Sequence, residues 1–184
     1  WLLAVGALAA ASGIWVDKIM IWASPLGVYE VGGLLHAPVY DSPMFFASLT
    51  IIPALAQFSA ALEQRFVPLY REYFDGIARH DTLAEIERKS TALSRCTFDI
   101  FSRLVLLQGA GCAIVILASP AIIEMMQFRF HQLAILRWGC IGMAFYFLFI
   151  ATASLLVFFE RYAWFAVLHI TFFVMCGMLT SMSQ

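Results

Sequence analysis

Two charged residues, Asp17 and Lys18, stand inside the first apolar stretch of the chain, residues 1–24. A charged side chain in hydrocarbon is costly, so such residues usually face a cavity or a partner. Trp15, Lys18 and Trp22 recur at i, i+3 and i+7 and share one helix face, whereas Asp17 points about 100° away from Lys18. An ammonium between two indoles suits cation–π contact, and indole faces also stack on the apolar face of a sugar ring. The pattern indicates a polar path.

The same residues have a second interpretation, in which Asp17 and Lys18 lie near a membrane–water interface. Trp15 and Trp22 then belong to the aromatic belt of that interface, and the lysine extends its ammonium into water. Both interpretations need a membrane-spanning helix at this place. The positions of these side chains therefore depend on which segments form such helices.

The overall composition predicts a membrane protein. Hydrophobic residues make up 62% of the 184 residues and charged residues 12%, against about 45–50% and about 25% in average chains. The mean hydropathy is +0.86, and a soluble fold of this size has too small an interior to bury so much apolar surface. The net charge of −1 provides no basic excess for binding nucleic acid.

Charged residues are concentrated in one segment, because 14 of the 23 lie in Glu63–Arg103. The rest of the chain falls into apolar runs long enough to cross a hydrocarbon core of about 30 Å as helices. The sequence therefore predicts an all-α, polytopic transmembrane bundle that forms a single membrane domain. Its five spans are expected at residues 1–24, 42–62, 104–123, 138–159 and 162–184, with a helical connector at 63–103.

Local signals shape these elements. The capping box Thr82-Leu83-Ala84-Glu85 predicts a helix that starts at Thr82 and continues toward the third span. Pro53 is expected to kink the second span. An irregular connection between the first two spans is indicated by Pro25, Gly27, Gly32, Gly33, Pro38 and Pro43. The connector is interpreted as a solvated or surface-lying helix, with docking of a partner as the alternative.

The distribution of basic residues predicts the orientation. If the first span runs outward, the connector and the turn at 160–161 are cytoplasmic and together carry eight Lys and Arg residues. The opposite side carries only Arg129 and Arg137. This asymmetry agrees with the positive-inside rule. We expect a multi-pass protein with its connector in the cytoplasm.

Motifs for catalysis or for a cofactor are not found in the sequence. The four cysteines are widely spaced without a C-x-x-C pair, so no metal site, disulfide or cofactor is expected. His169, in the fifth span, is interpreted as packing or hydrogen bonding inside the bundle in preference to relaying protons. An integral-membrane transferase would need a carboxylate or His cluster such as Asp-x-Asp, and Glu63–Arg103 has none. The protein is therefore not expected to be an enzyme.

The two chain ends suggest a piece of a longer protein. Trp1 opens the sequence without Met, inside an apolar run that has no basic region before it, so it is not a signal peptide. Gln184 ends the sequence at the exit of the fifth span. We expect the chain to be a fragment of a larger membrane protein.

Five short segments occur in an order and spacing similar to those of one transporter family. They are Trp15-Val16-Asp17-Lys18-Ile19, Tyr40-Asp41-Ser42-Pro43-Met44-Phe45, Ile51-Ile52-Pro53, Glu63-Gln64-Arg65-Phe66 and Phe158-Phe159-Glu160-Arg161. Through them the chain resembles the Pel exopolysaccharide exporters of the PelG family. The resemblance extends from about Gly13 to Thr180 and corresponds to part of the exporter's C-terminal half.

This resemblance implies a MATE-like flippase fold, in which two helical bundles face each other across a central cavity. It implies passage of the Pel polymer, a partly deacetylated N-acetylhexosamine chain, across the bacterial inner membrane. The implied partners are a cytoplasmic glycosyltransferase and membrane-bound regulatory subunits, one of which reads cyclic-di-GMP. The chain would form part of the second bundle, without the N-terminal bundle.

On this basis we expect certain polar and aromatic residues to line a polymer path. They are Asp17, Lys18, Trp15 and Trp22 in the first span, Gln57 in the second and Gln108 in the third. Such side chains exchange hydrogen bonds with sugar hydroxyls and amides, and Asp17 could pair with the ammonium of a deacetylated unit. The alternatives are another cargo, namely a lipid-linked saccharide or a cationic drug, and the less favoured transferase.

Overall fold

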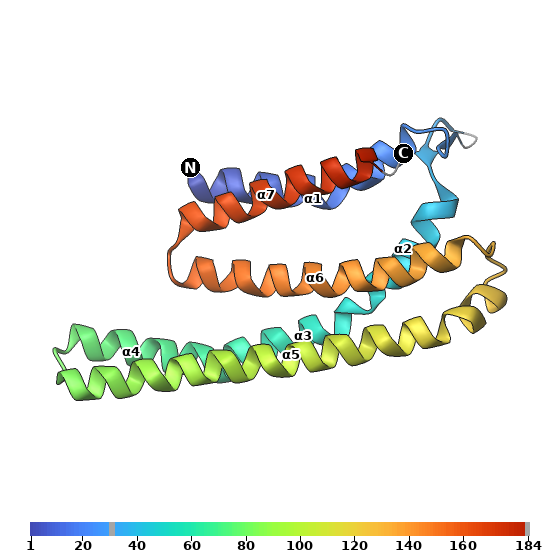
Figure 1. Ribbon diagram of the computed structural model, residues 1–184. Coiled ribbons are helices and arrows are strands. Elements are labelled where there is room, and N and C mark those ends of the chain that lie inside the picture. The colour runs from blue at the N-terminus through green and yellow to red at the C-terminus, as the bar shows by residue number, and fades with distance from the viewer. Residues whose placement is uncertain (30–31, 183–184) are drawn as a thin grey trace.

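The computed structural model describes residues 1–29 and 32–182, and this part consists of helices, one short hairpin and the turns that connect them. The elements are α1 (Leu2–Trp22), β1 (Val28–Tyr29), β2 (Leu35–His36), α2 (Pro38–Leu49), α3 (Ile51–Ala61), the π-helix η1 (Leu62–Phe66), α4 (Val67–Ala78), α5 (Leu83–Met125), α6 (Gln132–Phe158) and α7 (Tyr162–Met182) (Figure 1). β1 and β2 pair antiparallel, with Val28 opposite His36.

Five helices are long and apolar enough to cross a membrane: α1, the continuous run from α2 to α4, α5, α6 and α7. The predicted all-α polytopic bundle is therefore confirmed. Each predicted span overlaps one of these helices, and the last two residues of the fifth span, 183–184, lie outside the described residues.

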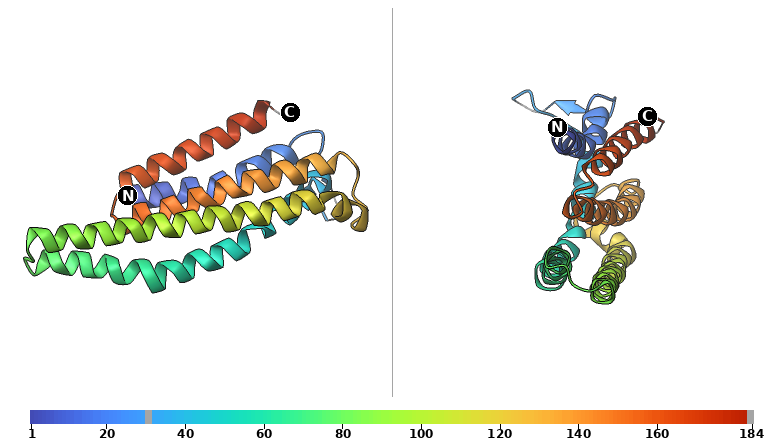
Figure 2. Two further views of the ribbon diagram at one scale, coloured as in Figure 1. Left: turned by 60° about the horizontal axis from the view of Figure 1, so that its bottom comes forward. Right: turned by 90° about the vertical axis from the view of Figure 1, so that its left-hand side faces the viewer.

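The helices are arranged in three layers (Figures 1 and 2). α1 lies along α7 as one pair, α6 lies in the middle, and α3 and α4 pack beside α5 on the far side. α2 packs against α6 and connects the hairpin to the third layer. The first and last spans of the chain are thus neighbours, although they are the most distant in sequence.

Two glycines allow α1 to approach α7 closely. A Cβ atom added at Gly6 would lie 2.6 Å from Cδ1 of Phe165, and one added at Gly13 would lie 2.7 Å from Cδ1 of Phe172. Small residues have this role at many helix contacts in membranes, because van der Waals packing replaces the hydrophobic effect there. The pair is held by rings of α7 that lie against bare backbone of α1.

Two prolines that we assigned to an irregular loop lie inside α2, so that prediction is wrong at Pro38 and Pro43. Pro38 occupies the start of the helix, where an amide hydrogen has no helical partner to lose. Pro43 deprives the carbonyl of Val39 of its helical donor. Gln132 Nε2 donates to that carbonyl at 3.1 Å, so α6 supplies the missing hydrogen bond.

The predicted interruption at Pro53 occurs one turn earlier, at Thr50, which separates α2 from α3. Proline disturbs the turn that precedes it, because its ring crowds the carbonyl four residues back. Another proline, Pro120 in α5, removes the donor to Ile116, and the hydroxyl of Ser119 donates to that carbonyl at 2.7 Å. The second span is thus interrupted at Thr50, and side-chain donors satisfy the carbonyls of Val39 and Ile116 that Pro43 and Pro120 leave without a helical partner.

The connector forms a helical hairpin of α4 and the first half of α5, which projects beyond the α6–α7 turn (Figures 1 and 2). α5 starts after Thr82 with the predicted capping box, in which Glu85 N donates to Thr82 Oγ1 and Thr82 N donates to Glu85 Oε2. α5 continues unbroken into the third span and has 43 residues. At about 1.5 Å per residue it is roughly twice as long as a hydrocarbon core is thick.

The main apolar core lies between α3, η1, α5 and α6. Phe66, Leu104 and Phe147 are its most deeply buried large side chains. His169 is buried on α7. Its ring contacts those of Phe165 and Phe149 edge-to-face, with ring centroids 4.4 and 4.8 Å apart. The histidine thus packs inside the bundle.

Candidate functional site

Polar side chains from α1 and α2 meet beside the β-hairpin, in what we call the Asp17–Asp41 cluster: Asp17, Lys18, Trp22, Tyr40 and Asp41. The hydroxyl of Tyr40 donates to Asp17 Oδ2 at 2.7 Å. Trp22 Nε1 donates to both carboxylate oxygens of Asp41, at 3.1 and 2.9 Å. Each carboxylate thus accepts a hydrogen bond from the other helix.

Asp41 is positioned by the start of α2. The amide of Ala37, directly before the helix, donates to Asp41 Oδ2 at 2.8 Å. A carboxylate in the first turn also complements the positive end of the helix dipole. Asp41 therefore fixes the entry of α2 and, through Trp22, the exit of α1.

The ammonium of Lys18 does not lie between the indoles of Trp15 and Trp22, where we expected it. Its ammonium donates to the carbonyl of Ile14 at 3.0 Å and lies 3.5 Å from Asp17 Oδ1. The indoles of Trp15 and Trp22 contact each other edge-to-face with their centroids 6.3 Å apart, a separation of touching rings that leaves no room for an ammonium between them. The clamp is wrong because the lysine folds back along its own helix and reaches its neighbour.

The cluster is partly open to its surroundings. The side chains of Asp17 and Lys18 retain 21% and 29% of their exposure. Trp15 is half exposed and lines an apolar hollow between α1 and α7 together with Ile19 and Phe173. Trp15 connects this hollow to the cluster, because its indole contacts that of Trp22.

Gln57 lies elsewhere, where α3 and η1 pass α5. It lines a cavity of about 200 Å³ together with Gln64, Arg65 and Arg103. Arg65 and Arg103 both donate to the carboxylate of Asp99, at 2.5 and 3.1 Å. These hydrogen bonds lower the pKa of Asp99, and the bond from Arg65 has the larger effect. Gln57 therefore faces a charged hollow near the connector.

Gln108 is buried in the bundle at 2% exposure. Its Nε2 donates to Thr50 Oγ1 at 3.4 Å and to Cys112 Sγ at 3.3 Å, and the thiol of Cys112 donates to the carbonyl of Cys140 at 3.2 Å. These bonds link α5 to α6 and to the break between α2 and α3. Gln108 holds the helices together at the interruption.

The six predicted path residues thus occupy three places. The structure brings Asp17, Lys18, Trp15 and Trp22 together and leaves Gln57 and Gln108 apart. Tyr40 and Asp41 complete the cluster, and our sequence reasoning missed them because it began the second span at residue 42. Pro38 followed closely by an acidic residue is a typical helix start and could have revealed them.

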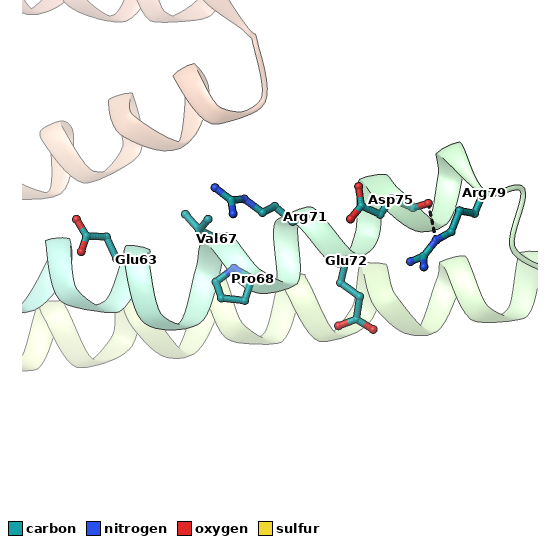
Figure 3. A pocket seen from close by; sticks show the side chains of 7 residues that line it. All are labelled: Glu63, Val67, Pro68, Arg71, Glu72, Asp75 and Arg79. Carbon is teal, nitrogen blue, oxygen red and sulfur yellow. Dashed lines mark hydrogen bonds between the residues drawn. The ribbon is translucent and has the colours of Figure 1, made fainter.

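One face of η1 and α4 forms a shallow hollow of about 770 Å³ on the connector (Figure 3). Side chains of both signs line it: Glu63, Arg71, Glu72, Asp75 and Arg79. Arg79 Nε donates to the carbonyl of Asp75 at 3.2 Å. Within the described residues, no group of three or more His, Cys, Asp or Glu side chains is placed to hold a metal ion.

Five helices long and apolar enough to cross a membrane indicate a multi-pass membrane protein. The family model described as "PelG: Putative exopolysaccharide Exporter (EPS-E)" matches residues 1–184. The chain therefore belongs to the PelG family of exopolysaccharide exporters, as the resemblance indicated. Comparison with curated proteins and with solved structures found no match.

Proposed function

We propose that the chain forms one wall of the path by which a Pel-type polymer, a partly deacetylated N-acetylhexosamine chain, crosses the bacterial inner membrane. The observation that carries this proposal is the match to an exopolysaccharide-exporter family over the whole chain. The chain is part of the second bundle of a MATE-like pair, and the N-terminal bundle closes the path. Its partners are a cytoplasmic glycosyltransferase and membrane-bound subunits that respond to cyclic-di-GMP.

The Asp17–Asp41 cluster supports a polymer contact by its chemistry. The carboxylate of Asp17 accepts hydrogen bonds from hydroxyl and amide groups and pairs with the ammonium of a deacetylated unit. Trp15 and Trp22 offer indole rings to the apolar faces of sugars. Transport by such contacts breaks no covalent bond, because each hydrogen bond to one sugar unit is exchanged for a bond to the next.

The experiment compares a strain that lacks the full-length exporter with the complemented strain. We expect the deletion to abolish secreted hexosamine polymer, and complementation to restore it. Accumulation of a lipid-linked saccharide would identify that cargo instead, and increased sensitivity to cationic drugs would identify a drug exporter. Either result with normal polymer secretion would contradict the proposal.

A further inference from the structure

A groove runs between α6 and α7 at the end of the bundle where these helices are joined. Its volume is about 610 Å³, within the range of about 300–1,000 Å³ that is typical of ligand pockets. α1 and η1 contribute Ala10 and Leu62 to its walls. We call this the α6–α7 groove, and it lies apart from the Asp17–Asp41 cluster, at the opposite end of α1 and α7.

A buried histidine in this groove lacks a partner. His169 is 5% exposed, and its Nδ1 has no hydrogen-bond partner among the described residues. The rings of Phe149 and Phe165 contact the imidazole edge-to-face. A buried polar atom without a partner costs free energy, so the arrangement favours a ligand that supplies a hydrogen-bonding group.

A carboxylate stands at the mouth of the groove. Glu160 is exposed and lies in the turn between α6 and α7. Its φ is 53°, a backbone conformation that residues other than glycine rarely adopt. No ion pair involves Glu160 within the part of the chain that the structure describes. Its oxygens are therefore available to accept hydrogen bonds.

Aromatic hydroxyl residues complete the lining. Tyr146 and Tyr162 line the groove, and Tyr146 also stacks on Phe172 with ring centroids 5.6 Å apart. A phenol ring offers a flat apolar face beside a group that donates and accepts hydrogen bonds. A lipid hydrocarbon chain would pack against the aromatic rings, but it would form no hydrogen bond with Nδ1 of His169 or with Glu160. A sugar unit presents an apolar face and polar edges together.

We propose that the α6–α7 groove is a binding subsite for a short stretch of hexosamine units of the exported polysaccharide. The inference rests on the proposed function and assigns it a second contact, at the opposite end of the bundle from Asp17. Tyr146 stacks on one sugar unit, whose hydroxyl or acetamide group hydrogen-bonds to Nδ1 of His169. His169 and the start of α7 are seven residues apart, roughly 10 Å along the helix, so Tyr162 and Glu160 contact a neighbouring unit at the mouth of the groove. By the positive-inside rule this end is cytoplasmic, where a polymer enters.

The experiment measures binding of a defined N-acetylhexosamine oligosaccharide to the full-length exporter in lipid nanodiscs. Glu160→Gln keeps an acceptor oxygen but removes the charge that strengthens its hydrogen bond, and His169→Phe removes the hydrogen-bonding nitrogen. Both preserve much of the side chain's size. We expect each to weaken binding by about tenfold, because the loss of the charge or of a buried hydrogen bond is of about that magnitude. Glu87→Gln and His131→Phe are the matched controls outside the groove, and their affinities should equal that of the wild type.

Unchanged affinity in Glu160→Gln would overturn the subsite, and this exposed position keeps the test valid even if His169→Phe fails to fold. Retention of a phospholipid in the groove at saturating saccharide, detected by native mass spectrometry, would also overturn it. In both cases wild-type binding and polymer secretion would leave the proposed function intact.

Normal secretion without the exporter would instead refute the function itself. A deacetylated oligosaccharide that loses more affinity than the acetylated one in Glu160→Gln would assign the carboxylate to an ammonium.

Discussion

Asp17 combines two demands at the scale of a single residue. A carboxylate within a span is costly unless it has partners, and Tyr40 and Lys18 supply them. These partners use only part of the capacity of a carboxylate, which has about four acceptor positions. Asp17 can therefore join α1 to α2 and still accept a hydrogen bond from a passing ligand.

Asp17→Asn tests this double role in the full-length exporter. The amide oxygen of asparagine still accepts from Tyr40, so protein abundance should stay near that of the wild type. The charge is lost, and we expect polymer secretion to fall by about tenfold, since a charge-assisted hydrogen bond contributes about 1.5–3 kcal/mol. Secreted hexosamine and membrane-fraction immunoblots measure the two quantities.

Lys18→Met and Tyr40→Phe are the companion variants. Protein abundance should stay normal in Lys18→Met because the bonds of Lys18 to described residues stay within its own helix. The phenylalanine should lower the free energy of unfolding by about 1–3 kcal/mol, because a donor to a charged group is removed. Wild-type secretion in Asp17→Asn at normal abundance would exclude Asp17 from the path.

At the scale of elements, the contact between α1 and α7 depends on the absence of side chains at Gly6 and Gly13. Gly6→Ala places a Cβ against the ring of Phe165 and 3.1 Å from the Cα of Ala166. We expect a loss of about 1–3 kcal/mol, the usual effect of overpacking, seen as a lower melting temperature in detergent. Gly109→Ala is the control, since nothing lies within 4 Å of its added Cβ and alanine favours a helix. A melting temperature in Gly6→Ala equal to or above that of Gly109→Ala would contradict the close packing.

Thr82→Ala removes the cap of α5. The amide and the carboxylate of Glu85 both lose the hydroxyl of Thr82, which should destabilise the start of this helix by about 0.5–2 kcal/mol. Hydrogen exchange of residues 82–90 should accelerate, and polymer secretion should stay normal if the connector is only structural. Thr91→Ala is the matched control, because the hydroxyl of Thr91 bonds to Glu87 O within the helix and caps nothing. Lost secretion at normal abundance would favour docking of a partner on the connector.

The turn between α4 and α5 should be sensitive to acid. Lys89 Nζ donates to Asp81 Oδ2 at 2.5 Å and lowers the pKa of Asp81 below its usual value of 3.8. A carboxyl group whose pKa is lower in the folded state stabilises that state above its unfolded pKa and loses the effect as the pH falls through the folded pKa. Opening of this turn, measured by hydrogen exchange corrected for intrinsic rates, should therefore increase between about pH 5 and pH 2. Asp81→Asn should open more readily at the higher pH and lose this dependence.

The sequence predicts these elements unevenly, for physical reasons. Apolar run length determines where helices can span a membrane, and the Thr82 capping box is a local hydrogen-bond pattern, so both could be predicted. The inclusion of Pro38 and Pro43 in α2 depends on Gln132, which is far along the chain and supplies the missing donor to Val39. A distant partner of this kind leaves no signal in the local sequence.

At the scale of the whole molecule, the pairing of the first span with the last could not be predicted either. Apolar helices have no hydrophobic preference for one neighbour over another in lipid, and packing of small residues against rings decides. The same limit applies to the candidate site. A carboxylate at position 17 and an indole at position 22 indicated the chemistry of the candidate site. Their hydrogen bonds to Tyr40 and Asp41 depend on how α2 returns to α1.

The orientation of the molecule gives the last prediction. Eight of the loop Lys and Arg residues lie in the connector and the turn at 160–161, against Arg129 and Arg137 on the other side, so the connector should remain in the cytoplasm. A reporter inserted near His80, at the tip of the α4–α5 hairpin, should be active as a cytoplasmic fusion. One near Gly32, in the β-hairpin, should be active as an external fusion, and one at the α6–α7 turn should agree with His80. Two reporters at His80 and Gly32 on the same side would refute five spans, because an odd number of crossings must separate them.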